Sequence, residues 1–526
     1  MFSTLPEELL TNILRHLDHP SLLACRLICH EINNVIQSSA ELQYYIELGK
    51  DGLVDCAAPS TPYSDRLATV IGRRHAWAAM EWTDTASVHL PGECLAYELV
   101  GDVLAKLTET HKFVCVELPS TPRAADTCQM DTSSINTWDL PFAARDFAMD
   151  PTQDLVIFLE DTRIPVASAK SRNTHLCIYS MATKEPHRLA QSPCLVINSP
   201  ESESLIHPFV GLPFIMFALL QIAEDVVLIQ FTTLAASVHV RLWNWMTGDL
   251  WLAEDYSMTC GGCGLLTARS FMLTSLQERG SIQIYTLEFS DDRDSRIPRS
   301  KLKATLLLPS LTPGISLRFF TTHSSPIVAR PLPSKMAFPT AESHIHVMSV
   351  AYDAQFGIRF RLYVPNRVLL SYAAMASGHT PILVPWHTWG PDNTRFMEQG
   401  DTSTWLRFVH GTRVVGPPVS RISPLEAPTP TSQTVLQLYD FNPYCRRLHS
   451  SVQPINGAKA ELQPETIVRK GSAFAETVTT RLPCRQILYR FDKRYTSFLI
   501  DDERLLSLEY TPLSERDLNN IDIYTF

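Results

Sequence analysis

Few residues in this chain have types and spacings that could do chemistry. Cys260-Gly-Gly-Cys263 is the one Cys-x-x-Cys motif. A zinc site of this kind needs a second pair of ligands, and no second cysteine pair completes it. A redox motif needs a strand-then-helix context that lowers a thiol pKa, and that context is missing. We therefore predict a glycine-rich loop at this position.

Two other clusters carry possible metal ligands. His16 and His19 have an His-x-x-His spacing, with Cys25 and Cys29 close by. All four fall within or beside an apolar helical pattern, where cysteine is usually a small core residue. The acidic run from Asp501 to Glu503 is interpreted as a solvated hairpin tip. We predict no metal site and no cofactor.

Known catalytic signatures are also missing from the sequence. It contains no phosphate-binding Walker loop, no dinucleotide fingerprint and no Gly-x-Ser-x-Gly elbow. Carboxylates are abundant, but nothing in the sequence pairs two of them for acid–base work. We predict no catalytic residue and no enzyme activity.

The elements around these residues are more informative. Pro6 and the acidic pair Glu7 and Glu8 are typical of a helix start. The apolar residues that follow have helical spacing up to Leu17, and Asp18 to Pro20 then break the helix. A second run with helical spacing comprises Leu22, Leu23, Leu27, Ile28, Ile32, Val35 and Ile36. We expect a small helical hairpin that leaves apolar surface for a partner or for the rest of the chain.

This run resembles an F-box. The matching stretches are LPEELL from Leu5, IL at Ile13, LD at Leu17, SLL from Ser21 and CRLICH from Cys25. The resemblance implies docking onto the Skp adaptor subunit of an SCF-type ubiquitin ligase. By position, the contact would be lined by Leu5, Pro6, Leu9, Ile13, Leu14, Leu17, Leu22, Leu23 and Ile28. Ile32 stands where the family often has tryptophan, which could weaken docking because buried tryptophan is often an anchor.

Composition is consistent with an intracellular, soluble protein. The chain has 526 residues, a formal net charge of −10 and 12 cysteines without a disulfide framework. The acidic balance gives no footprint for nucleic acid. Pro6 and the glutamates after it exclude a signal peptide at this position. The apolar stretch from Phe209 to Ala223 is too short to span a bilayer, so we expect no membrane association. The expected localisation is cytoplasmic or nuclear.

We predict three regions: an F-box over residues 1–40, a helical linker region over 41–87, and a β-rich substrate-recognition domain over 88–526. Ala57 to Ser64 is a candidate linker, and Arg66 to Met80 a further short helix. Paired short strands follow, among them Leu95 to Leu104, Leu155 to Leu159 and Tyr363 to Leu370.

Three segments of the β region share one form, an apolar-x-apolar-Tyr/Trp strand end followed by a turn. They begin at Cys177, Arg241 and Ile282, and a fourth at Val435 fits less well. Strand pairs recurring at roughly 40 to 65 residues are typical of a β-propeller. The blades loosely resemble WD repeats without their Gly-His and Trp-Asp marks, and we predict about seven. Two stacked β-sandwiches are the alternative.

Further stretches are similar to a large group of F-box proteins from mushroom-forming fungi: PWHTWGPDNTR from Pro385, WLRFVHGTRVV from Trp405 and FLIDDERLLSL from Phe498. Trp386 and Trp389 are expected to be packed structure, and Arg413 to hold a loop. The Pro-rich segment 416–433 and the segments 199–204 and 290–300 are interpreted as loops. The whole pattern predicts an F-box followed by a β-propeller that binds an unknown protein target for ubiquitin-dependent degradation. The alternatives that stay open are a propeller-fold enzyme, or a non-ubiquitylating scaffold, with an N-terminal helical cap.

Overall fold

The computed structural model describes residues 5–56, 61–108, 111–119, 135–161, 173–198, 215–233, 237–256, 259–290, 297–330, 337–353, 357–375, 380–399, 406–420, 434–455, 457–509 and 518–526. The predicted loops 199–204 and most of 416–433 lie outside these ranges, as do residues 57–60 of the candidate linker and 291–296 of the third predicted loop.

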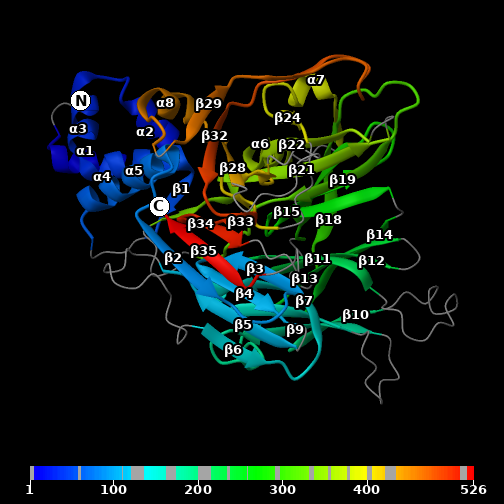
Figure 1. The fold of residues 1–526 in the computed structure, drawn as a ribbon. Helices are drawn as coiled ribbons and strands as arrows, with labels where there is room; N and C mark the ends of the chain where they lie inside the picture. Colours follow the sequence, from blue (N-terminus) through cyan, green and yellow to red (C-terminus); the bar gives the residue numbers. More distant parts are fainter. Residues whose placement is uncertain are drawn as a thin grey trace.

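Helices come first along the described chain and gather at one side of the β body (Figure 1). They are α1 (Glu7–Leu14), α2 (His19–Cys25), α3 (His30–Ser38), α4 (Ala40–Asp51) and α5 (Tyr63–Ala79). Asp18 caps α2 by accepting a hydrogen bond from the backbone N–H of Ser21, as expected for a helix stop and restart. The expected single second helix is wrong, because a turn at residues 26–29 divides it into α2 and α3.

The strands form seven sheets of at least four strands within the described ranges, each one a blade of a β-propeller. Blade 1 consists of β3 (Ala96–Val100), β4 (Val103–Leu107), β5 (Lys112–Glu117) and β6 (Ile135–Asp139). Blade 2 consists of β7 (Ala144–Asp150), β8 (Leu155–Glu160), β9 (Thr174–Ser180) and β10 (Cys194–Ile197). Blade 3 consists of β11 (Ile215–Ala223), β12 (Val226–Thr233), β13 (Val238–Asn244) and β14 (Leu250–Tyr256).

Blade 4 consists of β15 (Cys260–Thr267), β16 (Ser270–Ser275), β17 (Ser281–Glu288) and β18 (Arg299–Leu307). Blade 5 consists of β19 (Leu317–His323), β21 (Ile345–Tyr352), β22 (Arg359–Pro365) and β24 (Arg395–Glu398). Blade 6 contains β25 (Val409–His410), β26 (Arg413–Val415), β28 (Thr434–Asp440) and β32 (Cys484–Phe491), with β29 (Lys459–Gln463) beside β32 and β27 (Val419–Ser420) beside β28. Blade 7 contains β33 (Tyr495–Ile500), β34 (Arg504–Glu509), β35 (Asn520–Thr525) and β2 (Asp84–His89).

Smaller elements lie between or beside the strands of the blades. They are β1 (Leu53–Asp55) paired with β20 (Ala337–Pro339), β30 (Thr466–Val468) paired with β31 (Val478–Thr480), β23 (Ile382–Val384), α6 (Asn366–Ala373), α7 (Trp386–Trp389), α8 (Cys445–Ser451) and two short 3-10 turns at Pro151–Gln153 and Ala341–Ser343. The strand β23 extends blade 4 in parallel beside β18. Trp389 in α7 is fully buried and its indole N–H donates to the Leu307 carbonyl oxygen, which confirms a packing role.

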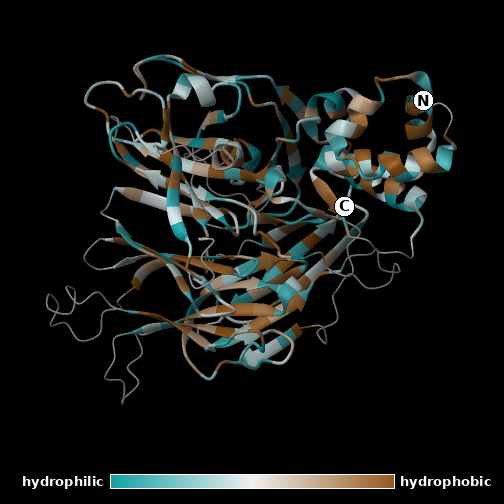
Figure 2. Cartoon of the chain, turned by 180° about the vertical axis from the view of Figure 1, so that it is seen from behind, coloured by the Kyte–Doolittle hydropathy of each residue, from teal (hydrophilic) through white to brown (hydrophobic). Residues whose placement is uncertain are grey.

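The hydrophobic core lies between neighbouring blades, and Figure 2 shows hydrophobic residues running along the strands. In β8, Leu155, Ile157 and Leu159 pack toward blade 3, whereas Val156 and Phe158 pack toward blade 1. A strand covered on both faces must be apolar throughout, which explains the unbroken LVIFL run. Other clusters join blades 3 and 4, 4 and 5, 5 through 7, and 7 and 1. This closed ring makes the alternative of two β-sandwiches wrong.

Blade 7 is completed by segments from opposite ends of the described chain. Its outer strand β2 follows α5, and it pairs antiparallel with β35 in a register from Asp84 opposite Thr525 to His89 opposite Asn520. Without β2, the strand β35 would be the exposed edge of a three-stranded blade. The ring therefore depends on contacts between residues more than 400 positions apart.

The repeated segments all fall at the same place in their blades. Those starting at Cys177, Arg241 and Ile282 begin within β9, β13 and β17, and the fourth begins within β28. Each of these is the third strand of its blade. Other predicted strand limits need correction. Leu95 to Leu104 spans the hairpin of β3 and β4, because Gly101 and Asp102 form a left-handed turn. Tyr363 to Leu370 changes from strand to helix α6 at Pro365.

Candidate docking surface and its attachment

Helices α1 to α4 form a small core of their own. Its buried residues are Leu10, Leu14, Leu22, Ile32, Val35, Ile36, Leu42 and Ile46, with Leu5, Leu17, Leu23, Cys25 and Tyr45 packed around them. Leu14 and Leu22 are 5% and 0% exposed. These two predicted contact residues therefore hold the helices together from inside instead of lining their surface.

Apolar side chains nevertheless remain on the outside of this helical unit. Leu9 and Ile13 are about half exposed and lie four residues apart, on one face of α1. Leu27 and Ile28 are 87% and 67% exposed in the turn between α2 and α3. We call these four residues the apolar surface of the helical unit. Each pair places two large apolar side chains close together in solvent, and exposed apolar patches often mark binding sites.

The other predicted contact residues have mixed positions. Pro6 is exposed immediately before α1, whereas Leu5, Leu17 and Leu23 are half-buried at the edge of the core. Leu27 was not among the predicted contacts, although it is the most exposed large apolar residue of this unit. Helical spacing placed it on a buried stripe, and the break of the helix turns it outward.

Ile32 belongs to the interior of the unit. It is 7% exposed and packs in the same cluster as Leu22 and Val35. In this chain the residue at the family's frequent tryptophan position therefore contributes to the core. The consequence for docking stays a prediction, because no contact with an adaptor is present.

Partly buried ion pairs join α4 to α5, and the end of α4 also contacts the propeller. Arg74 donates from Nε to Asp51 Oδ1 at 2.8 Å and from Nη1 to Glu47 Oε2 at 2.6 Å. Asn442, at the start of the α8 region of blade 6, donates to the Lys50 carbonyl oxygen and to Asp51. The same aspartate thus contacts both a helix of the linker and a blade.

Trp77 makes the main aromatic contact between α5 and the propeller. Its ring stacks on Phe526 with centroids 3.8 Å apart, and the Arg413 guanidinium lies over it at 4.8 Å. Its indole N–H donates to the Asp502 carbonyl oxygen at 3.2 Å. Arg413 thus stacks on a tryptophan of the linker helix. Its expected role in holding its own loop stays a prediction.

The turn between β33 and β34 is the centre of this attachment. Arg504 is fully buried and donates to Asp102 Oδ1 at 2.7 Å and to Asp501 Oδ2 at 2.8 Å. Asp501 also accepts from the backbone N–H groups of Glu503 and Arg504, while Glu503 pairs with Arg73 of α5 at 2.8 Å. The interpretation of this acidic run as a solvated tip is wrong, because Arg73, Arg504 and blade 1 enclose it.

Electrostatics hold the buried guanidinium in its charged form. Burial alone would lower the pKa of Arg504, but Asp501 and Asp102 outweigh it and raise that pKa above its ordinary value. Charged hydrogen bonds of this kind are strong where water is excluded. We call Asp102, Asp501, Glu503, Arg504 and Arg73 the ionic joint.

Blade 5 contains three histidines shielded from solvent: His344 and His346 are buried, and His323 is half-buried. Burial lowers the pKa of His344 to about 3, and of His323 and His346 to about 4, with nearby cations adding to the effect at His344 and His323. All three are neutral in the folded chain at neutral pH.

Because these folded pKa values lie below the unfolded value of about 6.5, the unfolded chain binds more protons in mild acid. Stability is therefore fully present above pH 6.5 and is lost as the pH falls toward 4. Replacing His346 with glutamine should lessen this loss by up to about 1.4 kcal/mol per pH unit. The free energy of unfolding of the original chain and the variant, measured between pH 4.5 and 7.5, checks this prediction. Equal dependence of that free energy on pH in the two proteins would contradict it.

The Cys-x-x-Cys motif at Cys260 and Cys263 is buried in a strand. Cys260 and Cys263 lie in β15, so the predicted glycine-rich loop is wrong. Burial raises the pKa of the Cys260 thiol to about 11 and that of Cys263 further. Within the described ranges, no group of three histidine, cysteine or acidic residues is arranged to hold a metal ion. In the same ranges, no helix has the length and apolar content to cross a bilayer.

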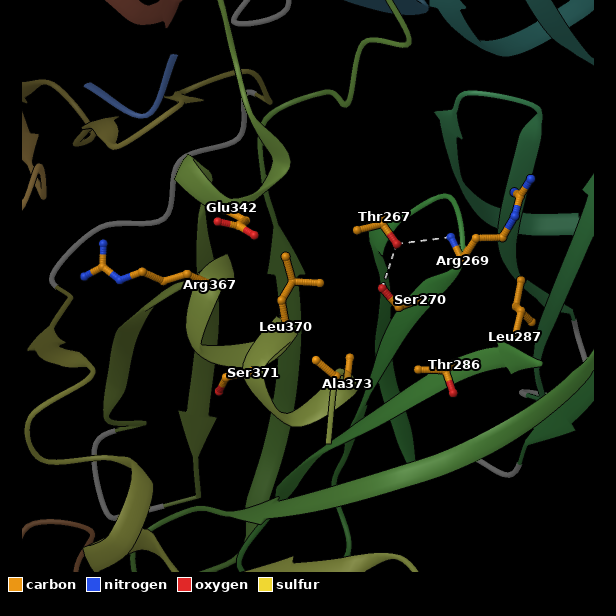
Figure 3. A pocket seen from close by; sticks show the side chains of 11 residues that line it. Thr267, Arg269, Ser270, Thr286, Leu287, Glu342, Arg367, Leu370, Ser371 and Ala373 are labelled. Atoms are coloured by element: carbon orange, nitrogen blue, oxygen red, sulfur yellow. Dashed lines mark hydrogen bonds between the residues drawn. The ribbon is translucent and has the colours of Figure 1, made fainter. Parts of the chain in front are cut away.

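A shallow hollow of about 620 Å³ lies between blade 4 and α6 (Figure 3). Glu342 is the single carboxylate among its lining residues, and Arg269 is paired with Asp225 at 2.7 Å. Hydroxyl groups of Thr267 and Ser270 bond to each other at 2.8 Å.

A helical unit with an apolar surface, fixed to a seven-bladed β-propeller, defines the class of this protein. Residues 2–43 match the F-box domain, so the chain carries an F-box followed by a propeller. No curated protein matches the chain.

Among solved structures, the WD40 domain of SCAP from fission yeast is 12% identical, with 84% of this chain and 98% of that chain covered and a TM-score of 0.39. U3-55K is 7% identical, with 84% and 98% covered and a TM-score of 0.33. The N-terminal domain of Nup159 is 10% identical, with 84% and 95% covered and a TM-score of 0.29. The blade assignment rests on the sheet pairing described above and not on these likenesses.

Proposed function

We propose that this chain is the substrate-recognition subunit of an SCF-type ubiquitin ligase. Its F-box binds the Skp adaptor, and its propeller binds a protein target. The observation that carries the proposal is the F-box match together with the unpartnered apolar surface of the same helices. The site of action would be intracellular, in the cytoplasm or the nucleus.

The adaptor contact is centred on Leu9, Ile13, Leu27 and Ile28. Their exposed side chains supply the apolar area, and burying such area drives association. Pro6, Leu5, Leu17 and Leu23 surround or support them, while Leu14 and Leu22 fix the helices from beneath. Adaptor binding of this kind needs no covalent chemistry on this chain, because the assembled ligase acts by bringing target and ubiquitin together.

The target is proposed to bind the end of the propeller that faces away from the F-box. The helices attach to the β33–β34 turn, to β20 between β19 and β21, and to α8 between β28 and β32. Each of these connections joins the first and second, or the third and fourth, strands of a blade. Antiparallel strands alternate direction, so such connections share one end of the ring, and the opposite end is left for a partner.

Adaptor binding is tested with purified full-length chain and purified Skp adaptor. Leu27→Asp with Ile28→Asp should weaken binding at least about 30-fold, because each charge would be buried without a partner in the complex. Titration calorimetry measures the Kd, and circular dichroism checks that the helices persist. Leu383→Asp on β23 is the matched control, since Leu383 is equally exposed but lies on blade 4. An unchanged Kd in the double variant would remove the proposal.

The target-binding end is tested after proximity labelling has identified the target. An amine-reactive cross-linker should join the target to Lys112 and Lys493, which lie at or beside connections at the free end. Lys184 lies in the β9–β10 connection at the other end and should not react. A ubiquitylation assay on the cross-linked partner then distinguishes two functions. Ubiquitin transfer to that partner indicates a ligase subunit, and its absence indicates a scaffold. Preferential links to Lys184 would contradict this orientation.

A further inference from the structure

Two cysteines face each other at the outer edge of blade 2. Cys177 in β9 and Cys194 in β10 are direct partners in the antiparallel register. Their Sγ atoms lie 3.6 Å apart in a thiol–thiol hydrogen bond. Both cysteines are free thiols in this structure.

The strand pairing places them at a position suited to a disulfide. The N–H of Ile178 donates to the Pro193 carbonyl oxygen at 2.8 Å, so Ile178 and Pro193 form a hydrogen-bonded pair. In an antiparallel ladder the two pair types alternate, which makes the adjacent Cys177–Cys194 pair a non-hydrogen-bonded one. Side chains approach most closely there, with Cα atoms about 4.5 Å apart, which falls within the range that disulfides span.

The two sulfurs differ in access to solvent. Cys177 is 6% exposed and packs in the core between blades 1 and 2, whereas Cys194 is half-buried on the edge strand. Hydrogen bonding with Cys177, aided by the nearby His175, lowers the pKa of Cys194. His175 is itself held by Glu160 at 2.6 Å. A half-exposed sulfur with thiolate character beside a second thiol is the usual setting of a redox-sensitive cysteine.

The contrast with Cys260 and Cys263 is informative. They form the one Cys-x-x-Cys motif, yet both are buried and burial raises both pKa values. Their thiols are shielded from oxidants and stay protonated at neutral pH. The reactive pair therefore lies 17 residues apart in sequence, where no short motif reveals it.

We infer that Cys177 and Cys194 form a reversible intrachain disulfide when the protein meets a hydroperoxide. The Cys194 thiolate attacks one oxygen of hydrogen peroxide, the O–O bond breaks, and hydroxide leaves, which gives a sulfenic acid on Cys194. The Cys177 sulfur then attacks the Cys194 sulfur, the S–O bond breaks, and the oxygen leaves as water. Two thiols are oxidised and one peroxide is reduced to two waters.

The disulfide would link β10, the outermost strand of blade 2, covalently to β9. It closes a loop that runs through the β9–β10 connection, and such a link limits the unfolded chain more than the folded one. The oxidised protein should unfold at a temperature a few degrees higher, and a dithiol reductant should reverse the shift. This inference does not depend on adaptor binding.

The test uses the full chain, oxidised with hydrogen peroxide, blocked with an alkylating reagent and digested with trypsin without reduction. Trypsin cuts after Lys184 and Arg188, so Cys177 and Cys194 fall in different peptides. Mass spectrometry should find these peptides joined, with the loss of two hydrogen masses, and separate again after reduction. Two separately alkylated peptides, or a disulfide to any other cysteine, would overturn the inference.

Serine variants assign the order of attack and guard against misfolding. Cys177→Ser should stop at a sulfenic acid on Cys194, which a cyclic 1,3-diketone traps, whereas Cys194→Ser should give no such adduct on Cys177. Cys260→Ser is the control and should keep both the crosslink and the reductant-reversible unfolding shift. Equal trapping in the two serine variants would contradict the assignment of Cys194 as the attacked thiol.

Discussion

Replacing Arg504 with methionine is expected to destabilise the folded chain by about 3 to 5 kcal/mol, the cost of removing one partner from a buried ion pair. Arg504 is fully buried, and Asp102 and Asp501 point their carboxylates at its Nη1. Methionine fills similar space but supplies no donor. The backbone carbonyl oxygens of Leu118 and Pro119 would lose their donor as well.

A matched arginine on the surface provides the control. Arg318 pairs with Asp353 at 2.8 Å, but its side chain is 70% exposed. Exposed ion pairs contribute only about 0 to 1 kcal/mol, so Arg318→Met should change stability little. Denaturant and thermal unfolding of the three proteins measure the difference. Equal losses in the two variants would show that the ionic joint contributes no more than a surface pair.

The second large effect distinguishes two adjacent residues of α1. Leu14→Asp should unfold the helical unit, since it places a carboxylate in the core beside Leu10 and Leu22. Ile13→Asp should leave the unit folded, because Ile13 is 48% exposed, and it should reduce adaptor affinity by about 10-fold or more.

Hydrogen exchange of α1 to α4 and adaptor titration separate these outcomes. The Leu14 variant should lose protection and binding together, whereas the Ile13 variant should lose only binding. Leu14→Met is the conservative control and should keep both. If the Ile13 variant lost protection as well, the side chain would be a core residue and the docking surface would have to be redrawn.

Local pattern was enough to predict several parts of this fold. Helical spacing predicted an amphipathic hairpin, and the resemblance of its leucine and proline positions to a known motif predicted the F-box. The third strand of four blades was predicted because an aromatic residue near its end recurs. The buried β8 was readable as a strand because LVIFL is apolar on both faces.

Other parts depend on residues that are distant in sequence. Asp501 and Glu503 resemble surface charges because the residues that enclose them are some 400 positions away. Asp102 shares the Arg504 guanidinium with Asp501, and Arg73 pairs with Glu503. The glycines between Cys260 and Cys263 resemble a loop, but a Cβ on Gly261 would lie 2.2 Å from the Phe320 carbonyl oxygen. Their role is close packing of β15 against β19, which no local rule indicates.

The exposed turn at Leu27 and Ile28 shows a different limit. Neither glycine nor proline interrupts residues 22–36, and the apolar spacing suits one continuous helix. The structure stops the helix at Cys25 and restarts it at His30. Two of the four residues of the apolar surface are therefore available only because the helix breaks.

The pairing of β2 with β35 also sets an order of events during synthesis. His89 lies opposite Asn520, so 431 residues must be translated between the strand that awaits closure and the one that supplies it. At about 5 to 20 residues per second, the ribosome needs roughly 20 to 90 s for that stretch. Throughout this time the F-box helices are already made while blade 7 is still open. The proposed adaptor site is thus complete before the ring that is proposed to bind a target can close.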